Sequence, residues 1–425
     1  MKIASVIVDV PTLQTDRPFD YAIPEEWQDF IQPGMRVIVP FGPRKLQGFV
    51  IALKDETDYE ARLKPIIEPM DAVPVLNEEL LYLGHYLAEN TLCFKISAYQ
   101  VMLPPALKAK YEKYLLLGEN TSLNELPDDL QKLFAKSDRV LWQEAEKYVK
   151  PSYLYRKSRE GFFEVLYEIK SKGNKKKNVY YLPAVDAEEL QRLADEHKWG
   201  KKQKQIIEFF LEHFTPIQIK DLSNYIKDPR TSLNSLVEKG ILKKEEHEEY
   251  RDPYKDRVFK KTEPLALTEN QQQVIQPILQ SIANNEHLVY LLHGVTGSGK
   301  TEIYLQAIEQ VIARGKEAIV LVPEISLTPQ MVERFKGRFG DNVAVMHSRL
   351  SLGEKYDEWR KIQRKEVQVV VGARSAIFAP FENLGIIIID EEHETSYKQE
   401  DTPRYHARDI AIERGKIHHC PVVLG

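Results

Sequence analysis

A glycine-rich segment at residues 294–301 limits the possible folds of this chain more than any other feature. Its sequence, Gly-Val-Thr-Gly-Ser-Gly-Lys-Thr, fills every position of the phosphate-binding pattern G-x-x-x-x-G-K-S/T. The apolar run 288–292 predicts a buried parallel strand before it, and residues 302–314 predict an amphipathic helix after it, ended by Gly315. A strand, a glycine loop and a helix in this order direct backbone N–H groups at a polyphosphate. The sequence therefore predicts an α/β lobe of the P-loop class.

The residue types of this segment predict separate roles in nucleotide binding. The glycines let the backbone wrap closely around an anion, Lys300 would reach the β- and γ-phosphates, and the Thr301 hydroxyl would hold Mg²⁺. The alternative is a chance match in an ordinary turn, which the flanking strand and helix make the weaker interpretation. The predicted ATP-binding residues of the loop are Gly294, Thr296, Gly297, Ser298, Gly299, Lys300 and Thr301.

A second signal is an apolar strand at 385–389 that ends in Asp-Glu-Glu-His at 390–393, a sequence of the DEAH-box type. A carboxylate at the end of a buried parallel strand is where a nucleotide-hydrolysing enzyme holds Mg²⁺, so Asp390 is the candidate metal ligand. Glu391 is placed to polarise the attacking water. A solvated acidic loop on the rim of the sheet is the alternative. With Lys300, these two acids are the predicted catalytic residues.

Length and composition narrow the possible classes of protein. The 425 residues predict roughly three domains. A net charge of −5 predicts no global attraction to nucleic acid, so any such contact must come from local basic surfaces. No apolar run reaches membrane-spanning length, and no secretory signal begins the chain, so a cytoplasmic location is expected without a membrane partner. The two cysteines, Cys93 and Cys420, provide neither a disulfide framework nor a zinc site.

The N-terminal residues 1–106 predict a small β-barrel or sandwich. Short β-branched runs at 4–10, 34–40 and 48–53 alternate with Pro and Gly turn clusters, and a helix is expected at 80–88. Two prolines at 104 and 105 mark a boundary. Beyond it, charged helices alternate with basic stretches such as 170–177, which is interpreted as a solvated loop, with DNA contact as the alternative.

Residues 107–252 are predicted to contain a winged helix, because three helices are followed by a strand. Its third helix would present Arg230, Ser232 and Asn234 to a nucleic acid. The same apolar positions could instead close a helical core or a protein-contact module, so DNA contact stays open. The expected elements are 206–214, 219–226, 230–239 and 241–244.

Residues 253–425 alternate between strands and helices in the α/β manner. The last predicted strand ends at Gly425 without a following element, so the lobe is expected to be incomplete at its C-terminus. The expected strands are 288–292, 318–322, 343–346, 367–371, 384–389 and 422–424.

Further short sequence motifs on both sides of the phosphate loop resemble those of a known protein family. They are Leu-Thr-Glu-Asn-Gln at 267–271, Val-Pro-Glu-Ile-Ser-Leu-Thr-Pro-Gln at 322–330, Val-Gly-Ala-Arg-Ser-Ala-Ile-Phe at 371–378, and an aromatic and basic segment at 396–409. Together they resemble the first motor lobe of superfamily 2 helicases. Arg-Pro-Phe-Asp-Tyr at 17–21 and Arg-Val-Ile-Val-Pro-Phe-Gly at 36–42 narrow the resemblance to the PriA family, the replication-restart helicases also called primosomal protein N′.

The resemblance implies a multidomain fold: a 3′-end DNA-binding domain, a winged-helix middle domain and a truncated RecA-like first helicase lobe. It implies an ATP- and Mg²⁺-dependent 3′-to-5′ DNA helicase that recognises branched DNA and the nascent 3′ end and starts primosome assembly. Single-stranded DNA, primosome proteins and single-stranded DNA-binding protein are the implied partners. The second lobe and a zinc-binding cysteine cluster are expected only beyond Gly425, so this chain alone is expected to be inactive.

The resemblance also assigns site residues. Phe19, Asp20, Gly42 and Lys64 would form a pocket for the terminal 3′ nucleotide, in which the ring stacks on a base and Asp20 accepts a hydrogen bond from the 3′ hydroxyl. Core packing is the alternative for Phe19. Gln271 is suited to read the adenine edge. The other expected DNA contacts are Arg374, Ser375, Tyr397, Lys398, Arg404, Tyr405, His406 and Arg408.

The segment at 397–408 is similar to the aromatic-rich loop that couples single-stranded DNA contact to ATP hydrolysis in this family. A surface loop tied down by ion pairs is the alternative for the segment. For the whole chain, the alternatives are another superfamily 2 translocase of repair or recombination and a non-catalytic DNA- and ATP-binding module.

Overall fold

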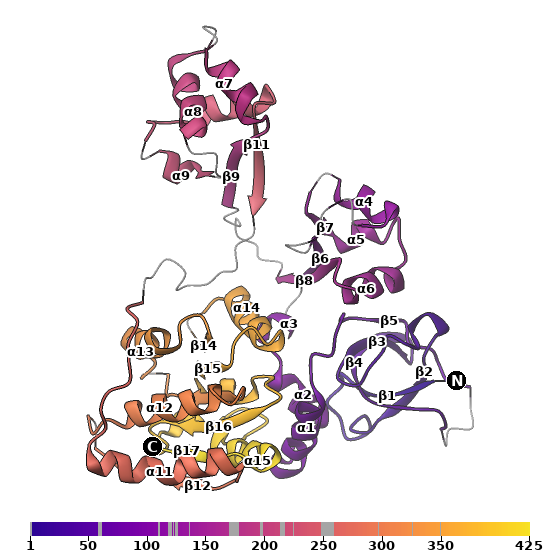
Figure 1. Cartoon of the computed structure of the whole chain (residues 1–425). Coiled ribbons are helices and arrows are strands. Elements are labelled where there is room, and N and C mark those ends of the chain that lie inside the picture. Colours follow the sequence, from indigo (N-terminus) through magenta and orange to yellow (C-terminus); the bar gives the residue numbers. More distant parts are fainter. Residues whose placement is uncertain are drawn as a thin grey trace. The chain divides into compact units, whose positions relative to one another are not determined.

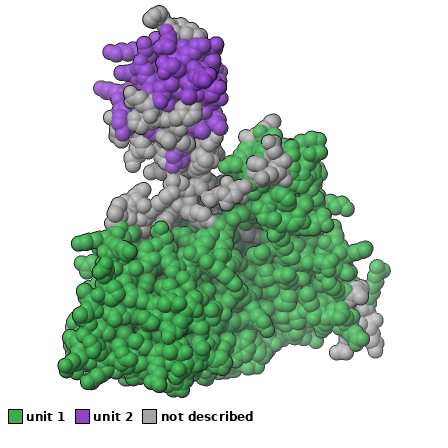
Figure 2. Space-filling view, in the orientation of Figure 1, with its two compact units in different colours: residues 1–170, 253–425 green, residues 171–252 purple. Residues whose placement is uncertain are grey.

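The computed structural model divides into two compact units, residues 1–170 with 253–425 and residues 171–252 (Figure 2). The first unit includes residues 107–170, which the sequence prediction placed in the middle domain. The predicted boundaries after residues 106 and 252 stay predictions, because compact units and domains need not coincide. The structure describes residues 2–57, 62–108, 111–117, 121, 123, 126–135, 137–169, 178–195, 199–212, 217–223, 225–247, 259–295, 297–324, 326–348 and 350–425.

The N-terminal sheet is antiparallel, with strand order β2-β1-β4-β3-β5 (Figure 1). The segment before β5 also bonds to the opposite edge, because the Ala22 N–H donates to the Lys64 carbonyl and the Ile66 N–H donates to the Ala22 carbonyl, both at 3.0 Å. The two edges are thus joined, which agrees with the small β-barrel predicted here. The strands are β1 (Ile3–Val8), β2 (Phe19–Ala22), β3 (Arg36–Phe41), β4 (Arg44–Lys54) and β5 (Glu68–Pro69), with a 3₁₀ turn, η1, at Glu25–Trp27.

Three helices follow the barrel: α1 (Glu78–Thr91), α2 (Lys95–Met102) and α3 (Pro105–Lys108). Helix α1 is longer than the predicted 80–88 because Asn77 caps it, with its side chain accepting the Leu80 N–H. A Cβ atom on Gly84 would lie 2.3 Å from the Tyr99 ring, so the absence of a side chain lets α1 and α2 pack closely.

Residues 111–169 contain a sheet that the sequence analysis did not predict, with strand order β7-β6-β8. Its core is continuous with that of the barrel, since the Tyr155 ring lies 4.4 Å from Trp142 and 4.9 Å from Phe30, measured between centroids. The prediction of charged helices was therefore incomplete here. The elements are β6 (Tyr111–Leu117), α4 (Asp128–Phe134), β7 (Arg139–Leu141), α5 (Trp142–Ala145), α6 (Pro151–Arg159) and β8 (Phe163–Ile169).

The C-terminal part of the first unit is a six-stranded parallel sheet with order β12-β17-β16-β13-β15-β14. Alternate residues of β16 face two cores: Ile386 and Ile388 lie in one, and Ile387 and Ile389 in the other. The architecture is that of a RecA-like lobe, as predicted. The strands are β12 (Val289–Leu291), β13 (Glu317–Leu321), β14 (Val343–Met346), β15 (Val369–Gly372), β16 (Leu384–Ile389) and β17 (Val422–Leu424).

Helices cover both faces of this sheet (Figure 1). Helices α11 (Glu269–Asn284), α12 (Lys300–Ile312) and α13 (Pro329–Phe339) contribute to one core. Helices α14 (Leu352–Gln363) and α15 (Ala407–His418) contribute to the other, together with α1 and α2. The 3₁₀ turns η3 (Arg374–Phe378) and η4 (Thr395–Tyr397) lie in the connections on either side of β16. None of the helices in the described ranges has the length and apolarity needed to cross a membrane.

The strand before the phosphate loop is not buried, and the prediction was wrong on this point. Val289 and Leu291 of β12 are 43% and 67% exposed, whereas every residue of β16 is buried. The reason is strand order, because β12 lies at the edge of the sheet and pairs only with β17 among the described strands.

A buried arginine joins the N-terminal helices to the lobe. The Arg414 guanidinium, on α15, is fully buried and donates to both carboxylate oxygens of Glu79 on α1, at 2.7 and 2.9 Å. It also donates to the carbonyls of Ile377, Ala379 and Phe381. Burial raises the pKa of Glu79, but Arg414 and the neighbouring His418 outweigh it and lower that pKa to about 2.

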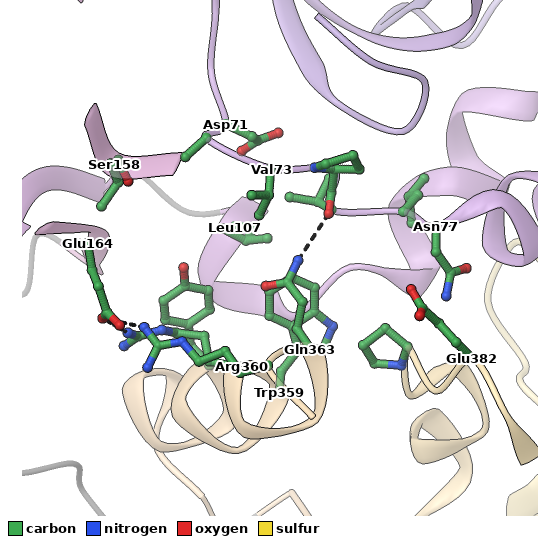
Figure 3. A pocket seen from close by; sticks show the side chains of 18 of the residues that line it. Asp71, Val73, Asn77, Leu107, Ser158, Glu164, Trp359, Arg360, Gln363 and Glu382 are labelled. Carbon is green, nitrogen blue, oxygen red and sulfur yellow. Dashed lines mark hydrogen bonds and ion pairs between the residues drawn. The ribbon is translucent and has the colours of Figure 1, made fainter. Parts of the chain in front are cut away.

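Helix α14 makes further contacts with the N-terminal part of the unit, and the residues involved line a cleft of about 510 Å³ (Figure 3). The Gln363 side chain on α14 donates to the Pro74 carbonyl at 3.0 Å. Arg360, on the same helix, pairs with Glu164 of β8 at 3.0 Å, and Arg364 pairs with the same carboxylate. Helix α14 thereby contacts both the segment that follows the barrel and the unpredicted sheet.

The described residues of the second unit form a three-stranded antiparallel sheet, β10-β9-β11, and four helices around one apolar core. The three predicted helices are present as α8 to α10, although the second is shorter than expected, and β9 was not predicted. The winged-helix assignment stays a prediction, and the basic run 170–177 lies outside the described residues. The elements are β9 (Asn178–Pro183), α7 (Ala187–Asp195), α8 (Lys201–Glu212), β10 (Ile217–Gln218), α9 (Ile219–Leu222), α10 (Arg230–Glu238) and β11 (Leu242–His247).

The Glu79 carboxylate predicts a pH dependence of stability. Its pKa is about 2 in the folded chain against an ordinary value of 4.5, so its contribution is complete above about pH 4.5 and is lost as the pH falls through the folded value. Between about pH 6 and pH 3 we expect the unfolding free energy of wild type to fall by on the order of 2 kcal/mol more than that of Glu79→Gln. Urea unfolding followed by circular dichroism measures both.

The matched control for this prediction is Glu89→Gln, which alters an exposed acid of the same helix that pairs with His85. Its pH dependence should be parallel to that of wild type. Identical pH dependence in wild type and Glu79→Gln would contradict the assignment.

Candidate functional site

The phosphate loop connects the edge strand β12 to α12, which begins at Lys300. Gly297 and Gly299 have φ values of 84° and 88°, a left-handed conformation that favours glycine. The first turn of α12 directly follows this loop, so helical N–H groups without partners in the helix point toward the loop. Strand, loop and helix are therefore arranged as the sequence predicted. Thr296 lies outside the described residues.

Two side chains are hydrogen-bonded within the loop region. The Lys300 Nζ donates to the Gly294 carbonyl at 2.8 Å. The Gln271 Nε2 donates to the Ser298 carbonyl at 3.0 Å, and its Oε1 accepts the Thr268 N–H in the capping box of α11. Both ends of the Gln271 amide are thus engaged beside the loop, and its contact with adenine stays a prediction.

Asp390 lies at the end of β16 and is 7% exposed. Its Oδ1 accepts a hydrogen bond from the Tyr304 hydroxyl at 3.0 Å, and its backbone carbonyl accepts one from the Tyr397 hydroxyl at 2.6 Å. Burial raises the pKa of Asp390 and the nearby Glu391 raises it further, while the bond from Tyr304 opposes the rise. Glu391 itself has a φ of 47°, which turns the chain sharply after the strand.

One cleft of about 670 Å³ brings the two predicted motifs together, because its lining includes Lys300 and Thr301 as well as Asp390 and Glu391. A hydroxyl and a carboxylate are hard oxygen donors of the kind that Mg²⁺ binds. No described cluster of three or more acidic, histidine or cysteine side chains could hold a metal by itself. Mg²⁺ usually takes one or two protein carboxylates and completes its shell with phosphate and water.

The sequence analysis missed several residues of this cleft. Met331, Arg334 and Arg338 of α13 also line it, and Arg338 pairs with Glu302 at 3.0 Å. Tyr304, which donates to the cleft residue Asp390, was signalled by its position three residues after Thr301, because such residues share a helix face.

The aromatic-rich loop is folded onto the lobe. The Arg374 Nη1 donates to the carbonyls of Ser396 and Lys398 at 3.0 and 2.8 Å. Tyr397 and Tyr405 are 1% and 3% exposed, so neither ring presents a face for stacking in this conformation. Contact of these two tyrosines with DNA stays a prediction and requires the loop to open.

The polar residues of this loop are accessible to different extents. Lys398, Arg404 and Ser375 are exposed, and the Lys398 Nζ donates to the Arg404 carbonyl at 2.7 Å. His406 caps α15 through the Arg408 N–H, and Arg408 pairs with Glu392 at 3.2 Å. Ion pairs and backbone bonds therefore hold the loop, and the exposed Lys398 and Arg404 are the candidates to meet a phosphate.

The predicted 3′-end pocket is built around Asp20 on β2. Its Oδ1 accepts the Ser5 hydroxyl at 2.8 Å, and its Oδ2 accepts the Thr57 hydroxyl at 2.6 Å and pairs with the Lys54 Nζ at 2.9 Å. Burial raises the pKa of Asp20, but these donors outweigh it and lower that pKa below its ordinary value. The cation beside the carboxylate is Lys54, which the sequence analysis did not identify, and no contact with Lys64 is found among the described residues.

Phe19 precedes Asp20 on β2, and Gly42 follows Phe41 in the chain. The Phe19 ring meets the edge of Phe41 at 5.3 Å, and the Arg17 guanidinium lies 5.2 Å from its centroid. Gly42 forms the turn between β3 and β4 with a φ of 57°. Because neighbouring residues on a strand face opposite sides, Phe19 and Asp20 would meet different parts of a nucleotide. Lys64 is exposed on the segment that closes the barrel.

Comparison with known families identifies two domains. Residues 5–104 match the PriA 3′ DNA-binding domain (3′BD), and residues 268–420 match the DEAD/DEAH box helicase domain. A solved structure of RecG bound to a three-way DNA junction is 24% identical over 38% of this chain and 21% of that chain, with a TM-score of 0.28, which is too low to support an argument.

Curated relatives match this chain over nearly its whole length. The replication restart protein PriA of Bacillus subtilis (strain 168) is 53% identical over 100% of this chain and 53% of its own length. That of Synechocystis is 33% identical over 99% of this chain and 51% of its own length. The chain thus spans about half the length of these relatives. With both domain matches on the same polypeptide, the chain belongs to the PriA family.

Proposed function

We propose that this chain binds ATP and the 3′ end of DNA as part of a replication-restart helicase. The observation that carries the proposal is the cleft that joins Lys300 and Thr301 to Asp390 and Glu391, in a chain that also matches the 3′ DNA-binding domain. A 3′-to-5′ direction, recognition of branched DNA, and primosome proteins and single-stranded DNA-binding protein as partners are proposed from the family.

The residues of the cleft have distinct proposed roles. Lys300 would exchange its bond to the Gly294 carbonyl for the β- and γ-phosphates, and the N-terminus of α12 would add backbone N–H donors. Thr301 and Asp390 would hold Mg²⁺, which when bound offsets the negative charge on phosphate oxygens. Glu391, at the rim of the cleft, would take the proton of the attacking water.

Asp20 would accept the 3′ hydroxyl of the nascent strand. A carboxylate has about four lone-pair sites, so three protein donors leave capacity for one more. Lys54 also holds the carboxylate ionised and in place. A 3′ phosphate at the same position would meet a negative charge and be repelled.

The first test concerns Lys300. Replacing it with alanine removes charge-assisted bonds worth about 1.5–3 kcal/mol each, so Lys300→Ala should weaken ATP binding by roughly ten- to a hundredfold. Binding to forked DNA should change little, because the 3′-end pocket lies on the barrel. Anisotropy titrations with a labelled ATP analogue and a labelled fork measure both.

The matched control is Lys416→Ala, which removes an exposed lysine of the same lobe that pairs with Glu413. It should bind both ligands as wild type does. Equal loss of ATP and fork binding in Lys300→Ala would mean that the two sites are not separate.

The second test concerns the 3′ end. Wild type should bind a fork with a 3′ hydroxyl at the junction more tightly than one with a 3′ phosphate, by roughly tenfold or more for one bond to a charged group. Asp20→Ala should lose most of this preference. Asp29→Ala, at an almost fully exposed acid of the same domain, should retain it. An unchanged preference in Asp20→Ala would place the pocket elsewhere.

The third test concerns turnover. An arginine from a facing lobe accelerates related phosphoryl transfers by about 10³-fold or more, and the described residues form one such lobe. The 425-residue polypeptide should therefore bind Mg·ATP weakly and release phosphate very slowly, with or without single-stranded DNA. Steady-state phosphate release measures this. Robust stimulation by DNA would contradict the two-lobe requirement.

A further inference from the structure

The Tyr304 hydroxyl has one hydrogen-bond partner among the described residues, the Oδ1 of Asp390 at 3.0 Å. Tyr304 is 2% exposed, and its ring packs in the core that α11, α12 and α13 form with the sheet. A buried hydroxyl without a partner costs free energy, so this contact is strongly favoured in the folded lobe. A carboxylate oxygen accepts and a phenol hydroxyl donates, so Tyr304 is the donor in this bond.

The surroundings leave the Tyr304 hydroxyl little freedom to turn. A Cβ atom on Gly425 would lie 1.7 Å from the Tyr304 oxygen, so the backbone at the end of β17 packs directly on it. The Gly425 carbonyl in turn accepts the Glu392 N–H at 2.9 Å, two residues after Asp390. The hydroxyl is thus confined between Gly425 and the acidic turn that follows β16.

A bond to one carboxylate oxygen restricts rotation of the carboxylate and so sets the direction of the other oxygen. Tyr397 fixes the backbone of the same residue through the Asp390 carbonyl, at 2.6 Å. Asp390 is consequently held at its side chain from α12 and at its main chain from the aromatic-rich loop. Groups that orient a metal ligand in this way commonly change metal affinity by about 10–100-fold when removed.

We propose that Tyr304 is a positioning residue for the metal-binding carboxylate, and that its hydroxyl orients Asp390 for the cation that accompanies the nucleotide. This inference rests on the proposed function, because Asp390, which Tyr304 would orient, lines the proposed nucleotide cleft. Tyr304 itself would touch neither the cation nor the nucleotide. The contribution is specific to the hydroxyl, whereas the ring supports the core.

The experiment is a Mg²⁺ titration of nucleotide binding by the full chain. Tyr304→Phe removes one oxygen atom and keeps the ring. The Mg²⁺ concentration for half-maximal binding of a fluorescent ATP analogue should rise roughly tenfold or more. Binding of the analogue in EDTA should match wild type, because Lys300 and the backbone donors do not depend on the phenol.

Two variants show whether Tyr304 acts through Asp390. Tyr290→Phe is the matched control, since it removes a hydroxyl bonded to Ser281 and Pro277 in the same lobe, and its Mg²⁺ requirement should be that of wild type. On an Asp390→Asn background, Tyr304→Phe should have no further effect. Gly425→Ala, whose Cβ would displace the Tyr304 hydroxyl, should raise the Mg²⁺ requirement as Tyr304→Phe does, which keeps the inference testable if the latter folds poorly.

Each outcome decides between the two proposals. If wild type binds the analogue with a clear Mg²⁺ dependence and Tyr304→Phe shows the same dependence, the inference on Tyr304 is wrong and the proposed function stands. An equal rise in Tyr290→Phe, or an additive effect on Asp390→Asn, would overturn it in the same way. If wild type shows no Mg²⁺-dependent binding, the proposed function falls and the inference with it.

Discussion

The Arg414 guanidinium holds the first unit together. It is fully buried, donates five hydrogen bonds and joins the first turn of α1 to α15, to η3 and to the chain that follows η3. A buried charge is tolerated only when its donors are satisfied, and removing one partner of such a pair typically costs about 3–5 kcal/mol. Because residues of α1 and α2 share a core with β16 and α15, the barrel and the lobe belong to one compact unit.

How much of the fold can be predicted depends on how clearly the residue pattern of each strand marks it as a strand. The strands β14, β16 and β17 were predicted to the residue, because each is a continuous apolar run. Strands β16 and β17 lie inside the parallel sheet, and β14, although at its edge, is buried at every residue but Met346. The edge position of β12 was not predictable, since strand order depends on pairings between distant segments. The sheet β7-β6-β8 was missed because its strands mix charged and apolar residues without the strict alternation that marks a half-buried strand: β6 reads Tyr-Glu-Lys-Tyr-Leu-Leu-Leu and β8 reads Phe-Glu-Val-Leu-Tyr-Glu-Ile.

The candidate site was predictable where chemistry follows local motifs. Lys300 and Asp390 lie far apart in the sequence, yet both follow parallel strands and so meet at the carboxyl edge of one sheet. Supporting residues carried no motif of their own. Lys54, at the end of β4, and Thr57 reach Asp20 over the intervening strand β1, and only the folded chain shows that contact. The burial of Tyr397 was also hidden, because a tyrosine in a loop sequence suits a solvent-facing ring as well as a packed one.

The edge position of β12 has a mechanical consequence. The strand before the phosphate loop pairs with one described neighbour, β17. The loop therefore follows an edge strand and not a strand paired on both sides. Among the strand pairings, a displacement of the loop strains that of β12 with β17 first, and local opening of so few bonds costs less than disturbing the interior strands. Strand β17 is followed by Gly425, whose backbone packs against the Tyr304 hydroxyl. Movement of the loop would therefore displace the acidic turn after β16 before it disturbs the interior strands of the lobe.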